Sequence, residues 1–403
     1  MYKKDSEVYI QNVSSVLEFI YRNPKTSRIE ISNATGLTPA AITNIISELI
    51  NKEWILETGD EISVINGSGR RRKVLTLNEK TGYLLGLEFN MNGLFISVTD
   101  ILGNTISNYC KKLDDNIIKN LNYEIISLIK KCIKNIDSSK ILGAGIAVPA
   151  HFDLNTQTII SNNLMWNNFN LFKIKKSFNF PFVIENNIEC MALGEYLFNS
   201  LSSPNKFLFF HVGHGLFCSF FDSNNLGINK NYYIGEIGHT VVDINGPKCE
   251  CGKKGCLQTY ISESWLLKNA RFFFQNSTNT ILQDLVKNED EITLKTIIAA
   301  YKLGDSYFRK NIDLGLQLLG TSIANTLIMR DADKIFLNGE LPSNELFSNQ
   351  IIEIVKSQMM FIPTKLDINI EIEKFDFYRG SHGACALASF AFFIKNINYI
   401  QND

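Results

Sequence analysis

The sequence lacks the features that mark secreted and membrane proteins. It has only eight cysteines and eight prolines among 403 residues. No uninterrupted apolar run approaches the roughly 18 residues that a membrane-spanning helix needs. The first ten residues are polar and lead into an amphipathic pattern, which is not typical of a secretory signal. We therefore expect a cytoplasmic protein with no membrane association.

The sequence also lacks a charge excess of either sign. Its 40 Lys and Arg residues balance 41 Asp and Glu residues, for a formal net charge of -1. Global basicity, which would indicate nucleic-acid binding over the whole surface, is absent, so any DNA contact must be a local patch. Hydrophobic residues make up 45% of the chain, which at this length predicts two or three domains with large cores.

Near the N-terminus, the residue pattern predicts three short helices with a turn between the second and the third. Ser27 and Glu30 form a capping-box pattern at the start of the second helix, and Gly36 predicts its end. Thr38 then predicts the cap of a third helix, with Pro39 at its first position. Two helices joined by a tight turn that contains glycine are typical of a helix-turn-helix.

Two surfaces of this segment are candidates for contact with double-stranded DNA. Small and polar residues on the third helix face away from its apolar stripe and suit base edges in the major groove. A Gly-rich tip between two predicted strands then precedes four cations, which suit phosphates. These candidates are Thr38, Ala40, Ala41, Thr43 and Asn44 on the helix and Arg70, Arg71, Arg72 and Lys73 on this wing. The alternative is a helical protein–protein module with a solvated basic turn.

From Leu84 onward, short apolar segments alternate with helical patterns. Buried strands are predicted at 141–149 and 207–212, and helices at 121–136 and 188–199. This alternation predicts an α/β body.

Three of the eight cysteines crowd into eight residues. Cys249, Cys251 and Cys256 follow His239 closely, and together these four residues form a complete tetrahedral ligand set for Zn²⁺. Because no coordination position is left open, the predicted zinc is structural rather than catalytic. The alternative is a set of free buried cysteines.

Four segments resemble the ROK family (repressors, open reading frames, kinases). They are GRRRKVLTLN at 69–78, GIAVPAHFD at 145–153, VIENNIECMALGE at 183–195 and, most specifically, GEIGHTVVDINGPKCECGKKGC at 235–256. The sequence is most similar to the family's xylose-type repressors, with the N-acetylglucosamine type close behind.

The resemblance implies a winged helix-turn-helix followed by an actin-like ATPase body, a ribonuclease H-like α/β fold of two lobes. It places the DNA-binding domain at 1–80 and the effector-binding and oligomerisation domain at 81–403. The lobes would comprise about 81–185 with the C-terminal helix, and 186–382.

Family kinases carry features that this sequence lacks. Their first phosphate loop corresponds to 88–92, which has neither the Asp, the Gly nor the Thr, and in the second loop Phe217 replaces a glycine. Their general base is the Asp of an Asn-Asp pair, which is Asn186-Asn187 here. An amide cannot accept a proton as that base does. We therefore expect no enzymatic activity.

The resemblance implies that a sugar pocket is better preserved than the phosphate site. Its expected residues are Asn163, Asn186, Asn187, Glu236, His239 and Gln258, with His239 also a zinc ligand. The expected function is a repressor of carbohydrate-utilisation genes that binds its operator as a homodimer or homotetramer and responds to a sugar or sugar phosphate. Three alternatives stay open: a relic pocket that binds nothing, a sugar kinase with a DNA-binding domain, and control by a protein partner such as a sugar-transport component.

Overall fold

The computed structural model describes residues 7–62, 72–153, 156–161, 163–225, 235–277, 279–361 and 368–395. They form two compact units, which are described separately. The first comprises Met1–Ser203 and Phe377–Asp403, and the second comprises Pro204–Asp376.

The first unit begins with three helices and a two-stranded sheet. Their bounds are α1 Glu7–Arg22, α2 Arg28–Thr35, α3 Pro39–Asn51, β1 Ile55–Ile62 and β2 Arg72–Leu77. The strands pair antiparallel, with Ile55 opposite Leu77. Ile residues of α1 and α3, including Ile20 and Ile46, are buried between the helices. This arrangement confirms the predicted winged helix-turn-helix.

The rest of the first unit is built on a five-stranded sheet with the order β5-β4-β3-β6-β9. The strands are β3 Tyr83–Asn90, β4 Gly93–Asp100, β5 Thr105–Lys111, β6 Ile141–Val148 and β9 Phe182–Asn186, and a hairpin is formed by β7 His151–Asp153 and β8 Thr158–Ile160. The helices are α4 Asp115–Lys119, α5 Leu121–Cys132, α6 Leu171–Lys175, α7 Asn187–Phe198 and α14 Arg379–Ser389, which a π-helical turn extends over Phe390–Ile394.

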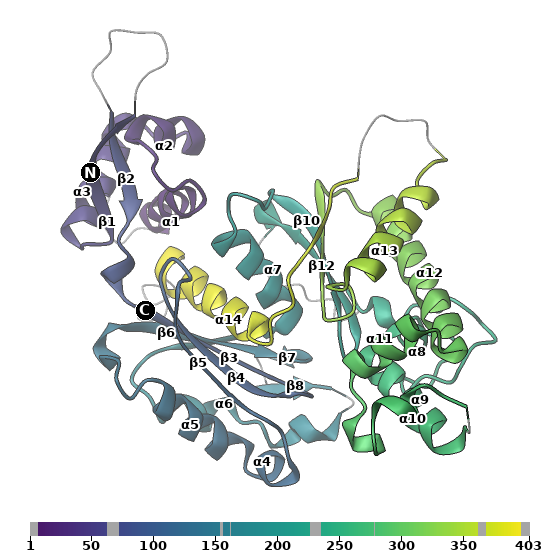
Figure 1. Ribbon diagram of the computed structural model, residues 1–403. Coiled ribbons are helices and arrows are strands. Elements are labelled where there is room, and N and C mark those ends of the chain that lie inside the picture. The colour runs from purple at the N-terminus through teal and green to yellow at the C-terminus, as the bar shows by residue number, and fades with distance from the viewer. Residues whose placement is uncertain are drawn as a thin grey trace. The chain divides into compact units, whose positions relative to one another are not determined.

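Helices cover both faces of this sheet (Figure 1). Helices α4, α5 and α6 lie on one face, and α14 crosses the other. Strands β3, β6 and β9 run parallel, so the carboxyl ends of these strands lie at one edge of the sheet. Ligands bind characteristically at such an edge of an α/β sheet.

The second unit combines a four-stranded sheet, β11-β10-β12-β13, with six α-helices among its described residues. The strands are β10 Lys206–Val212, β11 Leu216–Asp222, β12 Lys334–Asn338 and β13 Ile370–Ile372. The helices are α8 Gln258–Ile261, α9 Glu263–Asn276, α10 Leu282–Leu285, α11 Leu294–Leu303, α12 Ser306–Met329 and α13 Glu345–Gln358. Together, the two units confirm the predicted α/β body.

The boundary between the units falls later in the chain than the expected 185/186. Helix α7, expected in the second lobe, belongs to the first unit because it packs directly against α14. Glycines permit this contact: a Cβ on Gly383 would lie 2.4 Å from the carbonyl oxygen of Cys190, and one on Gly194 would lie 3.1 Å from the Cα of Gly383. The two helices therefore touch backbone to backbone.

One helix among the described residues, α12, is long and apolar enough to cross a membrane by length and composition alone. Its residues Phe308, Ile312, Leu316, Leu319 and Ile323 are buried in the core of the second unit. Core helices of water-soluble proteins pass the same test, so α12 gives no indication of a membrane protein.

Candidate functional site

The predicted helix caps are formed as expected and define the turn of the helix-turn-helix. Ser27 and Glu30 form a complete capping box on α2, with the Ser27 N–H donating to the Glu30 carboxylate at 2.8 Å. Gly36 ends α2 in the left-handed conformation at φ 69°. Thr38 caps α3 by accepting a hydrogen bond from the Ala41 N–H at 3.3 Å. These contacts fix the turn that orients α3.

The predicted recognition residues lie at the start of α3. Thr38, Ala40, Thr43 and Asn44 are exposed and Ala41 is half-buried. The buried side of the same helix carries Ile42, Ile45, Ile46 and Leu49. The described surface of α3 thus presents small side chains in its first two turns, where a recognition helix meets base edges. Ser47, one turn after Thr43, is also exposed on this face. The sequence pattern did not predict it as a DNA-contacting residue.

The wing is described only in part. Arg70 and Arg71 lie outside the described residues, and Arg72 is described only as the first backbone position of β2. Lys73 is exposed, and its ammonium lies 2.8 Å from the Glu57 carboxylate, which also pairs with Arg28 at 2.5 Å. Hydrogen bonds from Lys73 and Arg28 lower the pKa of Glu57. One of the four predicted cations is therefore partly neutralised within the domain.

Three predicted sugar-site residues lie in the first unit. Asn186 is the N-cap of α7: its Oδ1 accepts from the Ile188 N–H at 2.9 Å, and its Nδ2 donates to the Ala150 carbonyl at 3.1 Å. Asn187, the next residue, is buried. Asn163 caps a 3₁₀ turn through the Met165 N–H at 3.0 Å. Two of these three amides therefore also fix local backbone.

Glu88 is a site residue that the sequence analysis missed. It lies on β3, is 1% exposed, and accepts a long hydrogen bond of 3.5 Å from the Asn187 Nδ2. Burial raises the pKa of Glu88 to about 7, against hydrogen bonds from Asn90 and Asn187 that lower it. The sequence assigns this position only to the segment that corresponds to the first phosphate loop. A carboxylic group that stays close to half-protonated at neutral pH can donate as well as accept hydrogen bonds.

The other three predicted sugar-site residues lie in the second unit. Glu236 precedes one 3₁₀ turn, Ile237–His239, and the His239 N–H at the end of this turn donates to the Glu236 carbonyl at 3.1 Å. Gln258 begins α8 and is buried. Its amide donates to the Glu250 carboxylate at 2.9 Å and to the Cys249 sulfur at 3.5 Å. Gln258 is therefore engaged with the cysteine cluster.

His239, Cys249, Cys251 and Cys256 place one ligand atom each within 4.8 Å of one another. The Cys251 and Cys256 sulfurs are 3.6 Å apart, and the Cys249 sulfur lies 3.7 Å from the His239 Nδ1. A disulfide would require about 2.05 Å. Tetrahedral Zn–S bonds of about 2.3 Å place two sulfurs about 3.8 Å apart. The spacing of this cluster fits a tetrahedral metal ion.

Glycines allow the tight loop that brings the thiols together. Gly252 and Gly255 have φ values of 91° and 66°. A Cβ on Gly255 would lie 1.5 Å from the Asp243 carbonyl oxygen, so no other residue fits there. Both glycines therefore adopt the tight backbone that the loop requires.

The segment that matches the second kinase phosphate loop is filled by side chains. The Phe217 ring lies 2.9 Å from where a Cβ on Gly215 would project. The Glu263 N–H donates to the Gly213 carbonyl at 2.8 Å. Burial raises the pKa of Glu263, and the nearby Glu340 raises it further. The Phe217 ring therefore occupies space beside Gly215 in this loop.

Neither histidine near this loop is placed as a metal ligand. The His211 Nδ1 lies 2.8 Å from the Asn338 Oδ1, and burial lowers the pKa of both His211 and His214. His211 therefore packs as a neutral imidazole on β10, held by β12.

Comparison with known proteins identifies the class that this fold and these segments define. The model of the ROK family matches residues 96–390, and the model of a winged helix-turn-helix DNA-binding domain matches residues 14–55. The chain belongs to the ROK family.

Individual relatives cover both the regulators and the kinases of the family. The xylose repressor of Caldicellulosiruptor bescii is 29% identical over 377 residues, which are 89% of this chain and 90% of that protein. The crystal structure of a ROK family transcriptional regulator, a homolog of the E. coli MLC protein, is 22% identical and aligns over 98% of both chains with a TM-score of 0.77. A ROK glucokinase from Streptomyces griseus, solved with glucose and AMPPNP, is 21% identical and covers 76% of this chain and 99% of its own, with a TM-score of 0.64.

The coverage separates the two kinds of relative. The regulator matches this chain over nearly its whole length, whereas the full glucokinase leaves about a quarter of it unmatched. At these identities the structural matches establish the fold alone.

Proposed function

We propose that this protein is a sugar-responsive transcriptional repressor of carbohydrate-utilisation genes, with xylose as its effector. The observation that carries the proposal is the exposed face of small residues on α3 in the same chain as a ROK body. The xylose repressor of C. bescii, which matches 89% of the chain, supports the choice of sugar.

The DNA-binding role rests on α3 and the wing. Thr38, Ala40, Ala41, Thr43 and Asn44 would contact base edges, and Arg70, Arg71, Arg72 and Lys73 would contact phosphates. A homodimer or homotetramer in the cytoplasm would place two such helices on successive major-groove turns of a pseudo-palindromic operator.

The effector role rests on the polar side chains that the family resemblance assigns to a sugar pocket. Asn163, Asn186, Asn187, Glu236, His239 and Gln258 would hydrogen-bond sugar hydroxyls, and Glu88 would adjust the orientation of Asn187. Buried amides and carboxyls bind a polyol well only when each of their polar atoms is paired, which makes such a site selective among sugars.

Phosphoryl transfer is disfavoured by Asn187 and by the second phosphate loop. Asn187 stands where the kinases carry their general base, and an amide cannot take the proton of an attacking hydroxyl. The Phe217 ring crowds Gly215 in the second phosphate loop. We infer that the protein has no sugar-kinase activity.

The cysteine cluster would hold a structural zinc ion through His239, Cys249, Cys251 and Cys256. The ion would supply no chemistry beyond cross-linking the loop, because the four protein ligands complete its coordination. Since the His239 Nδ1 faces Cys249, the Nε2 is left to bind a sugar hydroxyl.

The test is fluorescence anisotropy of the purified protein on DNA from upstream of its own gene, at fixed salt. Xylose, glucose, N-acetylglucosamine and its 6-phosphate are titrated separately. We expect tight binding that xylose releases. Release by another sugar would correct the effector. Binding indifferent to all four would refute effector control by these sugars and favour a protein partner, such as a sugar-transport component.

A further inference from the structure

The last residue of α1 reaches from the DNA-binding domain to the end of α7. The guanidinium of Arg22 donates to the carbonyl of Tyr196 at 2.7 Å and to the carbonyl of Ser203 at 2.5 Å. It also lies 4.2 Å from the centroid of the Tyr196 ring. The last carbonyls of a helix have no partner within the helix, and Arg22 supplies one from another domain.

Further contacts surround Arg22 on the same side of α1. The Tyr196 hydroxyl donates to Glu18 at 3.2 Å, and Glu18 also pairs with Lys395 at 3.3 Å. Tyr21 is buried, and its hydroxyl meets the Ser389 hydroxyl of α14 at 3.2 Å. The domain is therefore docked on α7 and α14 through both polar and apolar contacts.

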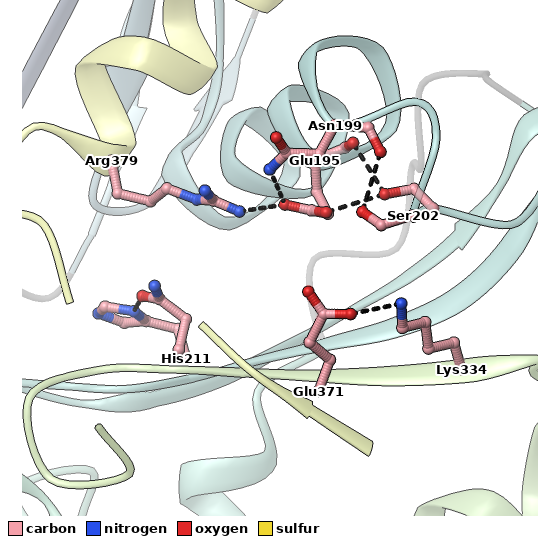
Figure 2. A network of polar contacts seen from close by, with 9 residues as sticks. Glu195, Asn199, Ser202, His211, Lys334, Glu371 and Arg379 are labelled. Atoms are coloured by element: carbon pink, nitrogen blue, oxygen red, sulfur yellow. Dashed lines mark hydrogen bonds and ion pairs between the residues drawn. The ribbon is translucent and has the colours of Figure 1, made fainter. Parts of the chain in front are cut away.

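The acceptor Ser203 belongs to a buried polar cluster. Glu195, which is fully buried, accepts hydrogen bonds from the Ser203 hydroxyl and the Asn199 amide, both at 2.8 Å. It also pairs with Arg379 at the start of α14 (Figure 2). Arg22 thus contacts the end of α7 and Ser203, a segment that Glu195 links to α14.

The opposite end of α7 carries the candidate sugar residues Asn186 and Asn187. The helix has 12 residues and is about 18 Å long. The helix lies in close backbone contact with Gly383 of α14, and a helix packed in this way transmits a displacement of one end to the other.

Helix α1, which ends at Arg22, also contacts the recognition helix α3. The hydroxyl of Tyr9 on α1 donates to Glu48 on α3 at 2.7 Å. Buried hydrophobic residues of α1, such as Leu17 and Ile20, fill the space between these helices. A rotation of α1 therefore rotates α3.

We propose that Arg22 is the positioning residue that couples the effector site to the orientation of α3. It fixes the DNA-binding domain on the C-terminal end of α7, whose N-terminal end contacts the sugar. This role rests on the proposed function, because it assigns the step between sugar binding and DNA release. Without Arg22, the domain keeps its fold and its DNA-contacting face, but its orientation no longer follows α7.

The test compares Arg22→Ala and Arg22→Lys with Arg28→Ala in the full-length protein. Arg28 is a matched control because its described ion pair, with Glu57, stays within the domain. The affinity for upstream DNA is measured with and without saturating xylose. Xylose weakens wild-type binding by a coupling factor of about 10 or more, and Arg22→Ala reduces this factor to about 2. The coupling factor of Arg22→Lys lies between these two values, because lysine offers a single ammonium in place of the forked guanidinium.

Xylose affinity, zinc content and xylose-free DNA affinity stay within about threefold of wild type in the Arg22 variants, which separates lost coupling from lost folding. An Arg22→Ala protein that keeps the full wild-type factor overturns the proposal.

A second readout does not depend on the effector. In xylose-free protein, Arg22→Ala raises hydrogen exchange in α1 and at residues 196–203 about tenfold, and Arg28→Ala leaves both unchanged. If wild-type protein ignores xylose, the proposed function fails. Unchanged exchange in Arg22→Ala refutes the docking role of Arg22 in either case.

Discussion

Replacing Glu88 by glutamine should make the protein more stable at alkaline pH. The unfolded chain ionises this glutamate near pH 4.5, whereas burial raises the pKa of Glu88 in the folded protein to about 7. The unfolded state loses the Glu88 proton at a lower pH than the folded state does. The free energy of unfolding therefore falls as the pH rises from 4.5 to 7 and is then constant. The shift of about 2.5 pH units corresponds to ~3 kcal/mol above pH 7.

The pH dependence isolates this effect from packing. At pH 5 the ionisation penalty is still only ~1 kcal/mol, and at pH 8 it reaches its full value. Glu88→Gln should therefore gain ~2 kcal/mol over the wild type between these two pH values. Any cost of fitting an amide against Gly380, which lies directly beside the carboxylate, is the same at both.

Urea unfolding followed by tryptophan fluorescence is a suitable assay. Trp166 is buried 5.2 Å from Phe89, the neighbour of Glu88 on β3, and so reports on this part of the first unit. Glu57→Gln is the control with the opposite sign: ion pairs lower the pKa of Glu57, so its stabilisation is present at neutral pH and is lost towards acid. If the difference between Glu88→Gln and wild type were independent of pH, the reasoning would be refuted.

Three further predictions follow from the other sites. Cys251→Ser should lose zinc and lower the melting temperature of the second unit by several degrees, checked by metal analysis and calorimetry; full zinc content would contradict the site. Asn187→Asp should restore a carboxylate without ATP turnover in a coupled assay, because both phosphate loops are altered; measurable turnover with any hexose or pentose would argue for a kinase. Asn44→Ala should weaken operator binding by about 1–3 kcal/mol with little effect on random DNA, whereas Gln317→Ala on α12 should change neither.

The local structure could be predicted because short-range chemistry determines it. The capping box of Ser27, the left-handed Gly36 and the cap at Thr38 depend on residues only a few positions apart. The same holds for the cysteine loop, where the spacing of the thiols and two glycines defines the turn.

The contacts between distant segments could not be predicted. The placement of α7 depends on glycines nearly 190 residues apart in the sequence, Gly194 and Gly383. The sequence assigns Glu88 only to the segment of the first phosphate loop, whereas the fold places it beside Asn187. In each case tertiary packing determines the partner, and a short sequence motif does not encode tertiary packing.

The central claim is that one molecule binds sugar and operator and that each weakens the other. Isothermal titration calorimetry of xylose into the free protein and into its complex with upstream DNA tests this claim most directly. Linkage requires xylose affinity to fall in the complex by the same factor by which xylose weakens DNA binding. We expect equal factors of about 10 or more. Identical xylose affinities with and without DNA would contradict it.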